Sequence, residues 1–267
     1  MTATRKIPVC LSIAGSDSGG GAGIQADLKA FAIAGVHGTT AITAITAQNT
    51  VAVSAVEAVS PQMIVAQVRA VVDDLGVDAV KLGMLGSIET IYAVLEALDL
   101  LAPGTPVVVD PVMVAESGAR LLDPGAEDAL RNLVLPRAGV VTPNVPEARA
   151  LVGDQRLDGG ELARAVHALG PRVVVLTGGH RDEATDVFYD GRQLVELSGQ
   201  RFQDGAAHGS GCTHAATLAA RLALGDDALT AARTAKLVAS AAVRDGLREL
   251  GCGAGPVDVL GLRARER

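Results

Sequence analysis

The sequence predicts a single α/β domain built on a doubly wound, mostly parallel sheet with helices on both faces. Apolar runs of strand length alternate with segments of helical periodicity along nearly the whole chain, and this alternation is typical of repeated βαβ units. Aromatic residues make up only 2% of the 267 residues, and Trp is absent. The core must therefore consist of Ala, Val, Leu and Ile, which suits a parallel sheet buried on both faces.

Nine short apolar runs, many of them rich in Val, Ile or Thr, are predicted as strands. In chain order they are Val9–Ala14, Thr40–Thr46, Val51–Val59, Ala79–Met84, Pro106–Asp110, Val140–Thr142, Arg172–Thr177, Asp186–Asp190 and Arg192–Leu197. The pair Asp190-Gly191 separates the last two runs and is typical of a tight turn. These two runs are therefore expected to form a small antiparallel hairpin.

Helices are predicted between the strands, where apolar residues recur with helical spacing. Apolar residues recur here at i, i+3/i+4 spacing, which predicts an amphipathic helix; they are Met63, Ile64, Val68, Val71, Val72 and Leu75. The other predicted helices are Ala22–Ala34, Ser87–Leu101, Pro124–Val134, Gly160–Leu169, Cys212–Leu224 and Asp226–Glu249. No linker, internal repeat or low-complexity tract interrupts this order, so residues 1–267 are interpreted as one domain.

Charge and cysteine content argue against several classes of protein. The net charge is −7 and no long basic run occurs, so no nucleic-acid partner is expected. The three Cys residues are far apart in the sequence, which favours neither a disulfide framework nor a metal pair and fits a reducing compartment. No apolar stretch has the length of a membrane span, and the first residues lack the apolar segment of a signal peptide. We therefore expect a cytoplasmic protein without a membrane partner.

A glycine-rich loop follows the first predicted strand and opens a helix. Its five glycines fall within residues 15–23, and such a loop lets backbone N–H groups approach a ligand closely. Gly21–Ala26 fits a loose dinucleotide fingerprint, although no acid ends a second strand at the usual distance for a ribose. The alternative is a substrate loop in which Asp17 accepts hydrogen bonds from a polar substrate. Ligands of open parallel sheets bind beyond the carboxyl ends of the strands, where this loop lies.

Small residues also precede the predicted helix Cys212–Leu224, in the segment His208-Gly209-Ser210-Gly211-Cys212-Thr213. Unpaired N–H groups and the dipole of a helix N-terminus would stabilise charge on a transferred phosphoryl group. A helix N-terminus also lowers the pKa of a thiol, so Cys212 could take a proton from an attacking hydroxyl. The alternative is a small buried hydrophobic residue, which is our interpretation of Cys10. No P-loop motif occurs in the chain.

Taken together, these motifs resemble those of hydroxymethylpyrimidine/phosphomethylpyrimidine kinases, which belong to the ribokinase-like superfamily. Residues Ile13–Lys29 match the N-terminal motif of that family without a gap, with Gly19 where Ser is more usual. Residues Gly209–Thr213 resemble its Gly-Thr-Gly-Cys-Thr motif, with Ser210 in place of Thr. Sugar and pyridoxal kinases of this fold typically have Asp at the position of Cys212, so a Cys there indicates the hydroxymethylpyrimidine branch. The resemblance extends from about Ile7 to Val257.

The resemblance implies roles for residues on the substrate side. Gly15 and Asp17 would lie near the substrate. Gln48 would recognise the aminopyrimidine edge, because a carboxamide offers a donor and an acceptor to a ring nitrogen beside an amine. Met84 would pack against the ring, or be an ordinary core methionine. Glu116 stands where the family often has a small or basic residue, which argues against phosphate binding at that position.

On the nucleotide side, the resemblance implies that Asn144 and Glu147 help to order Mg²⁺ through water, since Mg²⁺ keeps several waters and needs few carboxylates. From the sequence alone, the same two residues could simply form a proline-bracketed helix start. Thr177, Gly179 and Lys236 would contact the nucleotide. Many family members have Lys at the position of Thr177. Lys236 could instead be a solvated residue on a helix face.

The resemblance thus implies a kinase that phosphorylates 4-amino-5-hydroxymethyl-2-methylpyrimidine and then its monophosphate, using ATP and Mg²⁺, in thiamine biosynthesis. Cys212 would be the base, and the four N–H groups of Gly209, Ser210, Gly211 and Cys212 would bind the transferring group. The family also suggests a homodimer. Alternatives are a pyridoxal or pyridoxine kinase of the same fold, a dinucleotide-dependent oxidoreductase, and a non-catalytic pyrimidine-binding protein. His214 could lie on the surface, or beside Cys212 and tune its thiolate.

Overall fold

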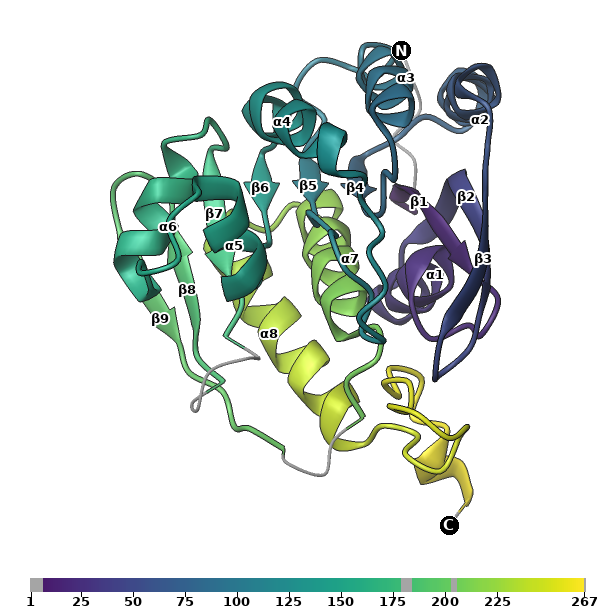
Figure 1. Ribbon diagram of the computed structural model, residues 1–267, viewed down its shortest axis with the longest axis vertical. Helices are drawn as coiled ribbons and strands as arrows, with labels where there is room; N and C mark the ends of the chain where they lie inside the picture. The colour runs from purple at the N-terminus through teal and green to yellow at the C-terminus, as the bar shows by residue number, and fades with distance from the viewer. Residues whose placement is uncertain (1–6, 179–183, 203–205, 267) are drawn as a thin grey trace.

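The computed structural model describes residues 7–178, 184–202 and 206–266 (Figure 1). Nine strands form one sheet in the order β3-β2-β1-β4-β5-β6-β7-β8-β9. The strands are β1 (Val9–Asp17), β2 (His37–Gln48), β3 (Val53–Ala58), β4 (Ala79–Leu82), β5 (Val107–Val109), β6 (Val140–Val141), β7 (Val173–Leu176), β8 (Asp186–Tyr189) and β9 (Leu194–Leu197). In this order, six neighbouring strands are parallel to one another, as predicted: β2, β1, β4, β5, β6 and β7.

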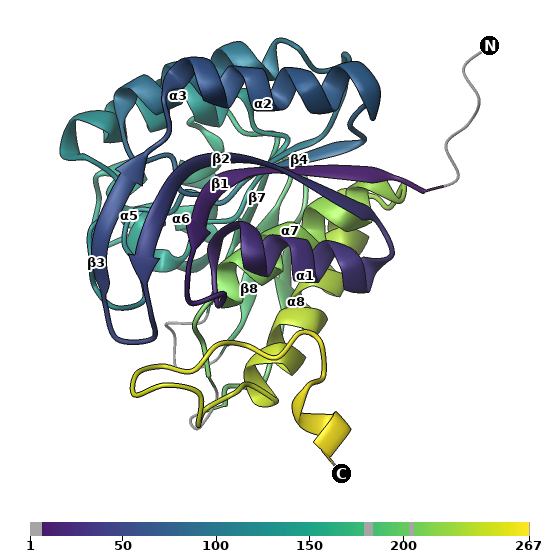
Figure 2. The ribbon, with the colours of Figure 1, turned by 90° about the vertical axis from the view of Figure 1, so that its right-hand side faces the viewer.

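Helices cover both faces of the sheet, and each helical layer encloses a core of aliphatic side chains. They are α1 (Gly23–Ala34), α2 (Pro61–Asp74), α3 (Ile88–Leu98), α4 (Glu127–Ala129), α5 (Val145–Val152), α6 (Gly159–His167), α7 (Ser210–Ala223) and α8 (Ala228–Arg244). Figure 2 shows α2 and α3 on one side of the sheet and α1, α7 and α8 on the other. In the described part of the chain, no helix is long and apolar enough to span a membrane.

The antiparallel part of the sheet is larger than predicted. The hairpin of β8 and β9 is confirmed, but its register joins Tyr189 to Leu194, so the loop has four residues rather than two. Asp190 closes this loop by accepting hydrogen bonds from the N–H groups of Arg192 and Gln193. At the opposite edge, β3 is also antiparallel to β2. For β2 and β3 the sequence predicted two strands with a turn between them, but not their antiparallel pairing.

Several helix boundaries also differ from the predictions; α8, for example, ends at Arg244 and not at Glu249. The segment 124–137 is not one α-helix but a chain of short 3₁₀, α and π turns, because Pro136 lacks an N–H group and cannot continue a regular helix. Helix α7 begins at Ser210, two residues earlier than predicted, after Gly209 in the left-handed region with φ 82°. Cys212 therefore lies within the first turn of α7 rather than at its start.

The order in which successive strands are added to the sheet reverses at β1. From β1 the chain passes through α1 to β2 on one side, whereas β4 pairs with the other side of β1. The connections that leave the carboxyl ends of β1 and β4 therefore diverge and leave a crevice between them, which is where ligands of such sheets bind.

Candidate active site

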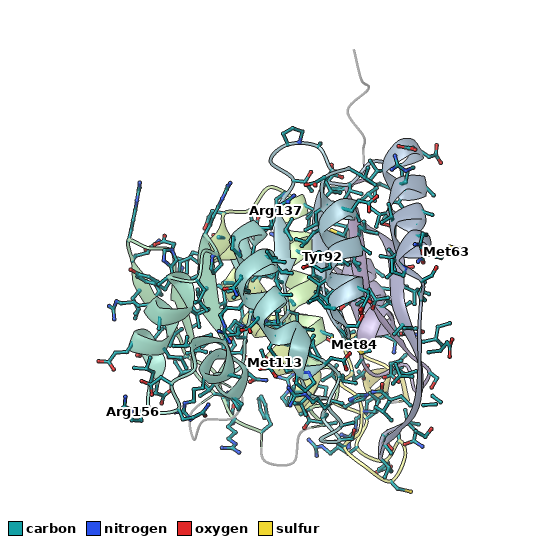
Figure 3. All side chains as sticks on the ribbon, turned by 45° about the horizontal axis from the view of Figure 1, so that its top comes forward. Met63, Met84, Tyr92, Met113, Arg137 and Arg156 are labelled. Carbon is teal, nitrogen blue, oxygen red and sulfur yellow. The ribbon has the colours of Figure 1, made fainter. Side chains whose placement is uncertain are left out.

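A cavity of about 1060 Å³ lies beyond the carboxyl ends of the parallel strands, against the first turn of α7. The residues predicted for the site that line it are Gly15, Asp17, Gln48, Met84, Asn144, Glu147, Thr177, Gly209, Ser210, Gly211, Cys212 and Lys236. Gly179 lies outside the described residues. Figure 3 labels Met84 and Met113, which follow β4 and β5 at this end of the sheet. Residues that are far apart in the sequence are thus brought together as predicted.

The start of α7 presents backbone N–H groups to the cavity. Within residues 7–178, 184–202 and 206–266, the N–H groups of Gly209, Gly211 and Cys212 have no hydrogen-bond acceptor. The N–H of Ser210 donates to the carbonyl of Ala207 at 3.0 Å, so three amides are available and not the predicted four. A Cβ atom built on Gly211 would meet nothing closer than Asp110 Oδ2 at 4.0 Å. The space beside Gly211 is therefore open, and because all three residues line the cavity, an anion in it can approach their amides.

Cys212 lies beside the carboxylate of Asp110, and the nearby thiol opposes the rise in the pKa of that carboxyl. The prediction of a lowered thiol pKa is wrong for the ligand-free protein. The pKa of Cys212 is raised to about 12, chiefly by burial; the charges of Asp110 and Asp27 act in the same direction, and the charge of Lys81 opposes them. Removal from water and two nearby carboxylates thus outweigh the helix dipole and one ammonium group. Cys212 is a neutral thiol at pH 7.

Beneath Cys212 lies a buried ion pair that sequence reasoning missed. Lys81 and Asp27 are fully buried, with 2.9 Å between Lys81 Nζ and Asp27 Oδ1. Ser12 donates to Asp27 Oδ2 at 2.6 Å, and Lys81 Nζ lies 3.8 Å from Asp110 Oδ2. Burial alone would lower the pKa of Lys81, but the charge of Asp27 and its other acidic neighbours raise it. The available signal was a Lys inside an otherwise apolar predicted strand.

Removing the partner of Lys81 is expected to destabilise the fold. In Asp27→Asn the ammonium keeps only the more distant Asp110, and we expect the free energy of unfolding to fall by about 3–5 kcal/mol. Urea unfolding of the wild type and the variant measures this change. The double variant Asp27→Leu/Lys81→Met should recover part of the loss, because it removes both charges. An Asp27→Asn protein as stable as the wild type would contradict the importance of this pair.

Two carboxylates face the cavity: Asp110, which directly follows β5, and Glu147, which lies in the first turn of α5 after β6. Burial raises the pKa of both groups, and the charge of Asp110 raises that of Glu147 further. Asn144 Oδ1 accepts from the N–H of Glu147 at 2.8 Å and Glu147 Oε2 accepts from the N–H of Asn144 at 2.9 Å. The predicted helix-start interpretation is therefore confirmed as a reciprocal capping box. The same two residues still line the cavity, so this does not exclude a role toward a ligand.

A divalent cation suits the environment of these acids. The buried atom Asp110 Oδ2 has no hydrogen-bond partner among the described residues, and a cation beside it would compensate two carboxylates that repel each other. The described residues contain no cluster of three or more His, Cys, Asp or Glu side chains able to enclose a metal. Mg²⁺ keeps most of its water shell and needs few carboxylates, so Asp110 and Glu147 are sufficient to fit it.

Asp17 organises the glycine-rich loop from within. Its Oδ1 accepts from the N–H of Gly19 at 2.8 Å, and its Oδ2 accepts from Gly21 at 3.0 Å and Ala22 at 2.8 Å. Oδ2 also lies 3.1 Å from His208 Nε2. Burial would raise the pKa of Asp17, but these hydrogen bonds hold it below its ordinary value. The carboxylate is thus occupied by the loop itself, whereas the prediction had it accept from the substrate.

The glycine-rich loop also packs closely against the start of α7, which is far away in the sequence. A Cβ atom on Gly21 would collide with the ring of His208, and one on Gly209 would collide with the carbonyl of Gly21. The close approach that these glycines permit is therefore used by protein atoms rather than by a pyrophosphate. The dinucleotide interpretation of Gly21–Ala26 is not supported by this arrangement. His208, for which no role was predicted, joins the two loops.

One end of the cavity, formed by β1, β2 and β4, combines apolar and amide groups. We call it the acceptor end; the residues that line it include Gly15, Thr46, Gln48 and Met84. A Cβ on Gly15 would lie 3.3 Å from Met84 Sδ, so the thioether packs against bare backbone. Thr46 Oγ1 lies 3.1 Å from Gln48 Oε1 and holds the carboxamide at the cavity wall. A flat heteroaromatic ring with an exocyclic amine fits these groups.

The other end lies between β7, β8 and α8, and we call it the nucleotide end. Lys236 is 8% exposed and donates to Asp186 Oδ1 at 2.7 Å, so the alternative of a solvated helix-face lysine is wrong. Asp186, which sequence reasoning missed, also accepts from the N–H of Gly178 at 2.8 Å. His214 is buried, with its Nε2 3.6 Å from Asp186 Oδ2, so the surface position proposed for it is wrong. Thr177 Oγ1 makes a long, 3.4 Å contact with the carbonyl of Pro143.

Comparison with known proteins places the chain among kinases. The family described as phosphomethylpyrimidine kinase matches residues 17–258. A hydroxymethylpyrimidine/phosphomethylpyrimidine kinase of Rhizobium meliloti is 50% identical over 260 residues, which cover 93% of this chain and 96% of that protein. The protein of the same name from Streptomyces coelicolor is 44% identical over 255 residues and covers 94% of each chain.

Solved structures share the fold. An ADP complex of pyridoxal kinase from Bacillus subtilis matches with a TM-score of 0.87 and 37% identity, covering 97% of this chain and 99% of that chain. Phosphomethylpyrimidine kinase from Clostridium difficile matches with a TM-score of 0.76 and 39% identity, covering 86% and 96%. The ribokinase-like fold expected from the sequence is thereby confirmed. Because both the family match and the relatives span most of the chain, the protein belongs to the phosphomethylpyrimidine kinase family.

Proposed function

We propose that this chain transfers the γ-phosphoryl group of ATP to the hydroxymethyl oxygen of 4-amino-5-hydroxymethyl-2-methylpyrimidine, and then phosphorylates the resulting monophosphate. The observation that carries the proposal is the start of α7, where three unpaired N–H groups and the thiol of Cys212 meet between the two ends of the cavity. Charge that develops on a phosphoryl group in transit is stabilised there by the amides and the helix dipole.

The acceptor end holds the pyrimidine so that its hydroxymethyl group points toward Cys212. The ring rests on Gly15 and Met84, and Gln48 hydrogen-bonds to its edge. The adenine nucleotide occupies the nucleotide end, where Lys236 and Thr177 lie at the wall. Placing the two reactants in one cavity with fixed orientation contributes much of the rate enhancement in such transfers.

The proton of the attacking hydroxyl leaves through Cys212 to Asp110. The raised pKa of Cys212 makes a free thiolate costly, but the thiol lies beside the Asp110 carboxylate, which can accept its proton. As the acceptor oxygen forms its bond to phosphorus, its proton passes to the sulfur while the thiol proton passes to Asp110. The sulfur therefore carries no net charge, and Asp110 becomes a neutral carboxylic acid, which its buried position favours.

Mg²⁺, when bound, supplies positive charge that offsets the charge of the phosphates. Glu147 and Asn144 are the residues that would hold its water shell, with Asp110 nearby. We include Mg²⁺ in the proposal because Asp110 Oδ2 is buried without a hydrogen-bond partner in the described part of the chain.

A homodimer is also part of the proposal. Ile45 on β2 and Val51 and Val56 in the hairpin of β3 are each more than half exposed, at 53%, 56% and 51%. Ile45 and Val56 lie on opposite faces of this hairpin, since Val56 pairs with Thr46, but an edge strand with exposed apolar side chains is a common contact between copies of a chain. Size-exclusion chromatography with light scattering measures the mass directly; twice 27.0 kDa supports a dimer, and a monomer at micromolar concentration opposes it.

A pyridoxal kinase is the second candidate, because pyridoxal kinase structures match the fold with TM-scores up to 0.87. A coupled assay for ADP release decides between the two candidates, with Mg-ATP and either the aminopyrimidine alcohol or pyridoxal as acceptor. We expect kcat/KM to be higher for the aminopyrimidine alcohol. A higher value for pyridoxal would favour the second candidate. No ADP release with either acceptor would contradict both.

Shortening Gln48 tests the placement of the acceptor. In Gln48→Ala the ring edge loses its hydrogen-bond partner, and we expect KM for the aminopyrimidine alcohol to rise about tenfold. The KM for ATP should stay the same, because the nucleotide lies at the other end. Steady-state kinetics with each substrate varied in turn provides both values. Equal changes in the two KM values would place Gln48 outside the acceptor site.

A further inference from the structure

The charged side chains of the cavity are distributed unevenly between its ends. The cavity-lining residues that come from the ends of β1 and β2, from Met84 after β4 and from residues 112–121 are Ala14, Gly15, Ser16, Asp17, Thr46, Gln48, Met84, Val112, Val114, Ala115, Glu116 and Leu121. This set contains two acids and, within the described part of the chain, neither Lys nor Arg. Asp17 is buried in its loop with its oxygens engaged, which leaves Glu116 as the exposed charge of this end.

The basic side chains that line the cavity are placed elsewhere. Lys81 is fully buried and held by Asp27. Lys236 is paired with Asp186 at the nucleotide end. Arg201 belongs to the segment between β9 and α7, which passes beside Lys236 at Gly199. An anionic group at the acceptor end therefore meets no lysine or arginine that could balance Glu116, as far as the described residues go.

Glu116 is carried over the acceptor end by residues 112–122, which we call the flap. An antiparallel bridge joins Val114 to Arg120, and the N–H of Gly118 donates to the carbonyl of Ala115 at 2.8 Å. These contacts fold the flap into a tight turn that has Glu116 near its tip. In Figure 1 this segment leaves β5 and runs toward the lower end of α7.

Two further contacts fix the direction of the flap. Directly after it, the N–H of Asp123 donates to the carbonyl of Gly86 at 2.8 Å, two residues beyond Met84, which ties the flap to the acceptor end. Arg120, the basic residue of the flap, makes its contacts outside the cavity. Its Nε donates to the carbonyl of Leu122 at 2.8 Å, and its guanidinium pairs with Glu127. The flap thus places the carboxylate of Glu116 at the acceptor end and holds the guanidinium of Arg120 away from it.

We infer that Glu116 makes the acceptor end select the neutral hydroxymethyl acceptor over the anionic monophosphate, an inference that rests on the proposed kinase function. A phosphate monoester carries a charge of about −1.5 to −2 at pH 7. It must approach the first turn of α7 beneath the flap, where the exposed carboxylate repels it. The alcohol has no charge and meets no such barrier. The chain therefore performs its first phosphorylation more efficiently than its second.

Charge substitutions on the flap test this inference. Because Glu116 is exposed on a turn, Glu116→Gln and Glu116→Lys should fold normally, which circular dichroism checks. The second-order rate constant kcat/KM is measured separately for the alcohol and the monophosphate at low ionic strength. For the monophosphate we expect it to rise about threefold in Glu116→Gln and about tenfold in Glu116→Lys. For the alcohol, both variants should stay within about twofold of the wild type, since a neutral acceptor feels little of this charge.

A matched control separates the local effect from the change in net charge. Glu96 is exposed on α3, outside the cavity lining, so Glu96→Lys makes the same charge change and should leave both rate constants unaltered. Added salt should shrink the effect of Glu116→Lys, because ions screen exposed charges. Unchanged monophosphate kinetics in both Glu116 variants, or an equal gain in Glu96→Lys, would overturn the inference. Absence of product from both acceptors in the wild type would instead overturn the proposed function.

Discussion

Replacement of Cys212 by Ala is expected to lower kcat by about 100- to 10,000-fold, the usual contribution of a group that moves a proton in the transition state. The side chain lies in the first turn of α7, beside the open amides and the Asp110 carboxylate. Without the thiol, the proton of the attacking hydroxyl has no relay to Asp110. The backbone N–H groups remain, so binding of ATP should be largely unchanged.

Steady-state kinetics and isothermal titration calorimetry with a non-hydrolysable ATP analogue measure these two properties. The other cysteines provide the controls. Cys252 is exposed, so Cys252→Ala should retain full activity. Cys10 is fully buried in β1, so its replacement should affect stability more than catalysis. Turnover of Cys212→Ala within about threefold of the wild type would remove the thiol from the mechanism.

Replacement of Asp110 by Asn is expected to reduce kcat by a similar factor, because it removes the group that finally accepts the proton. The amide is close in size to the carboxylate, and Lys81 keeps its partner Asp27 at 2.9 Å. The fold should therefore tolerate the change. This prediction separates a relay from the simpler scheme in which Cys212 acts as a thiolate, since that scheme requires no acceptor beyond the sulfur.

The pH dependence of kcat gives a second test of Asp110. Burial raises the pKa of this carboxyl above its ordinary value of about 4. The carboxylate form is the one that accepts a proton, so activity should increase as the pH rises through that raised pKa. In Asp110→Asn this acid limb should disappear. A profile with the same acid limb in both proteins would assign the titration to another group and contradict the relay.

Much of the architecture could be predicted because it depends on local pattern. The alternation of apolar runs and helical segments located the parallel strands, and motifs that directly follow strands located the cavity. The antiparallel pairing of β3 with β2 was not predicted, because the sequence of a strand does not indicate on which side of its neighbour it pairs. The mixed helical turns of residues 124–137 were missed because the apolar spacing there suggested one regular helix.

The electrostatics of the site could not be predicted, because it arises between residues far apart in the sequence. Lys81 and Asp27 are 54 positions apart, and Lys236 and Asp186 are 50 apart. The thiol pKa of Cys212 was inferred from the helix dipole alone, whereas burial and the carboxylates of Asp110 and Asp27 decide it. The sequence around Cys212 does not indicate that Asp110 and Asp27 lie near it in the fold.

The binding of the transferring phosphoryl group to the first turn of α7 can be observed directly by NMR. Amide resonances of the ¹⁵N-labelled protein are recorded with ADP, Mg²⁺, aluminium fluoride and the aminopyrimidine alcohol, a mixture that mimics phosphoryl transfer. We predict that the amide protons of Gly209, Gly211 and Cys212 shift strongly downfield, as expected for new hydrogen bonds to an anion, while that of Ser210 shifts less because it already donates to Ala207. If these three resonances stayed in place while others in the cavity moved, the start of α7 would not be the site of transfer.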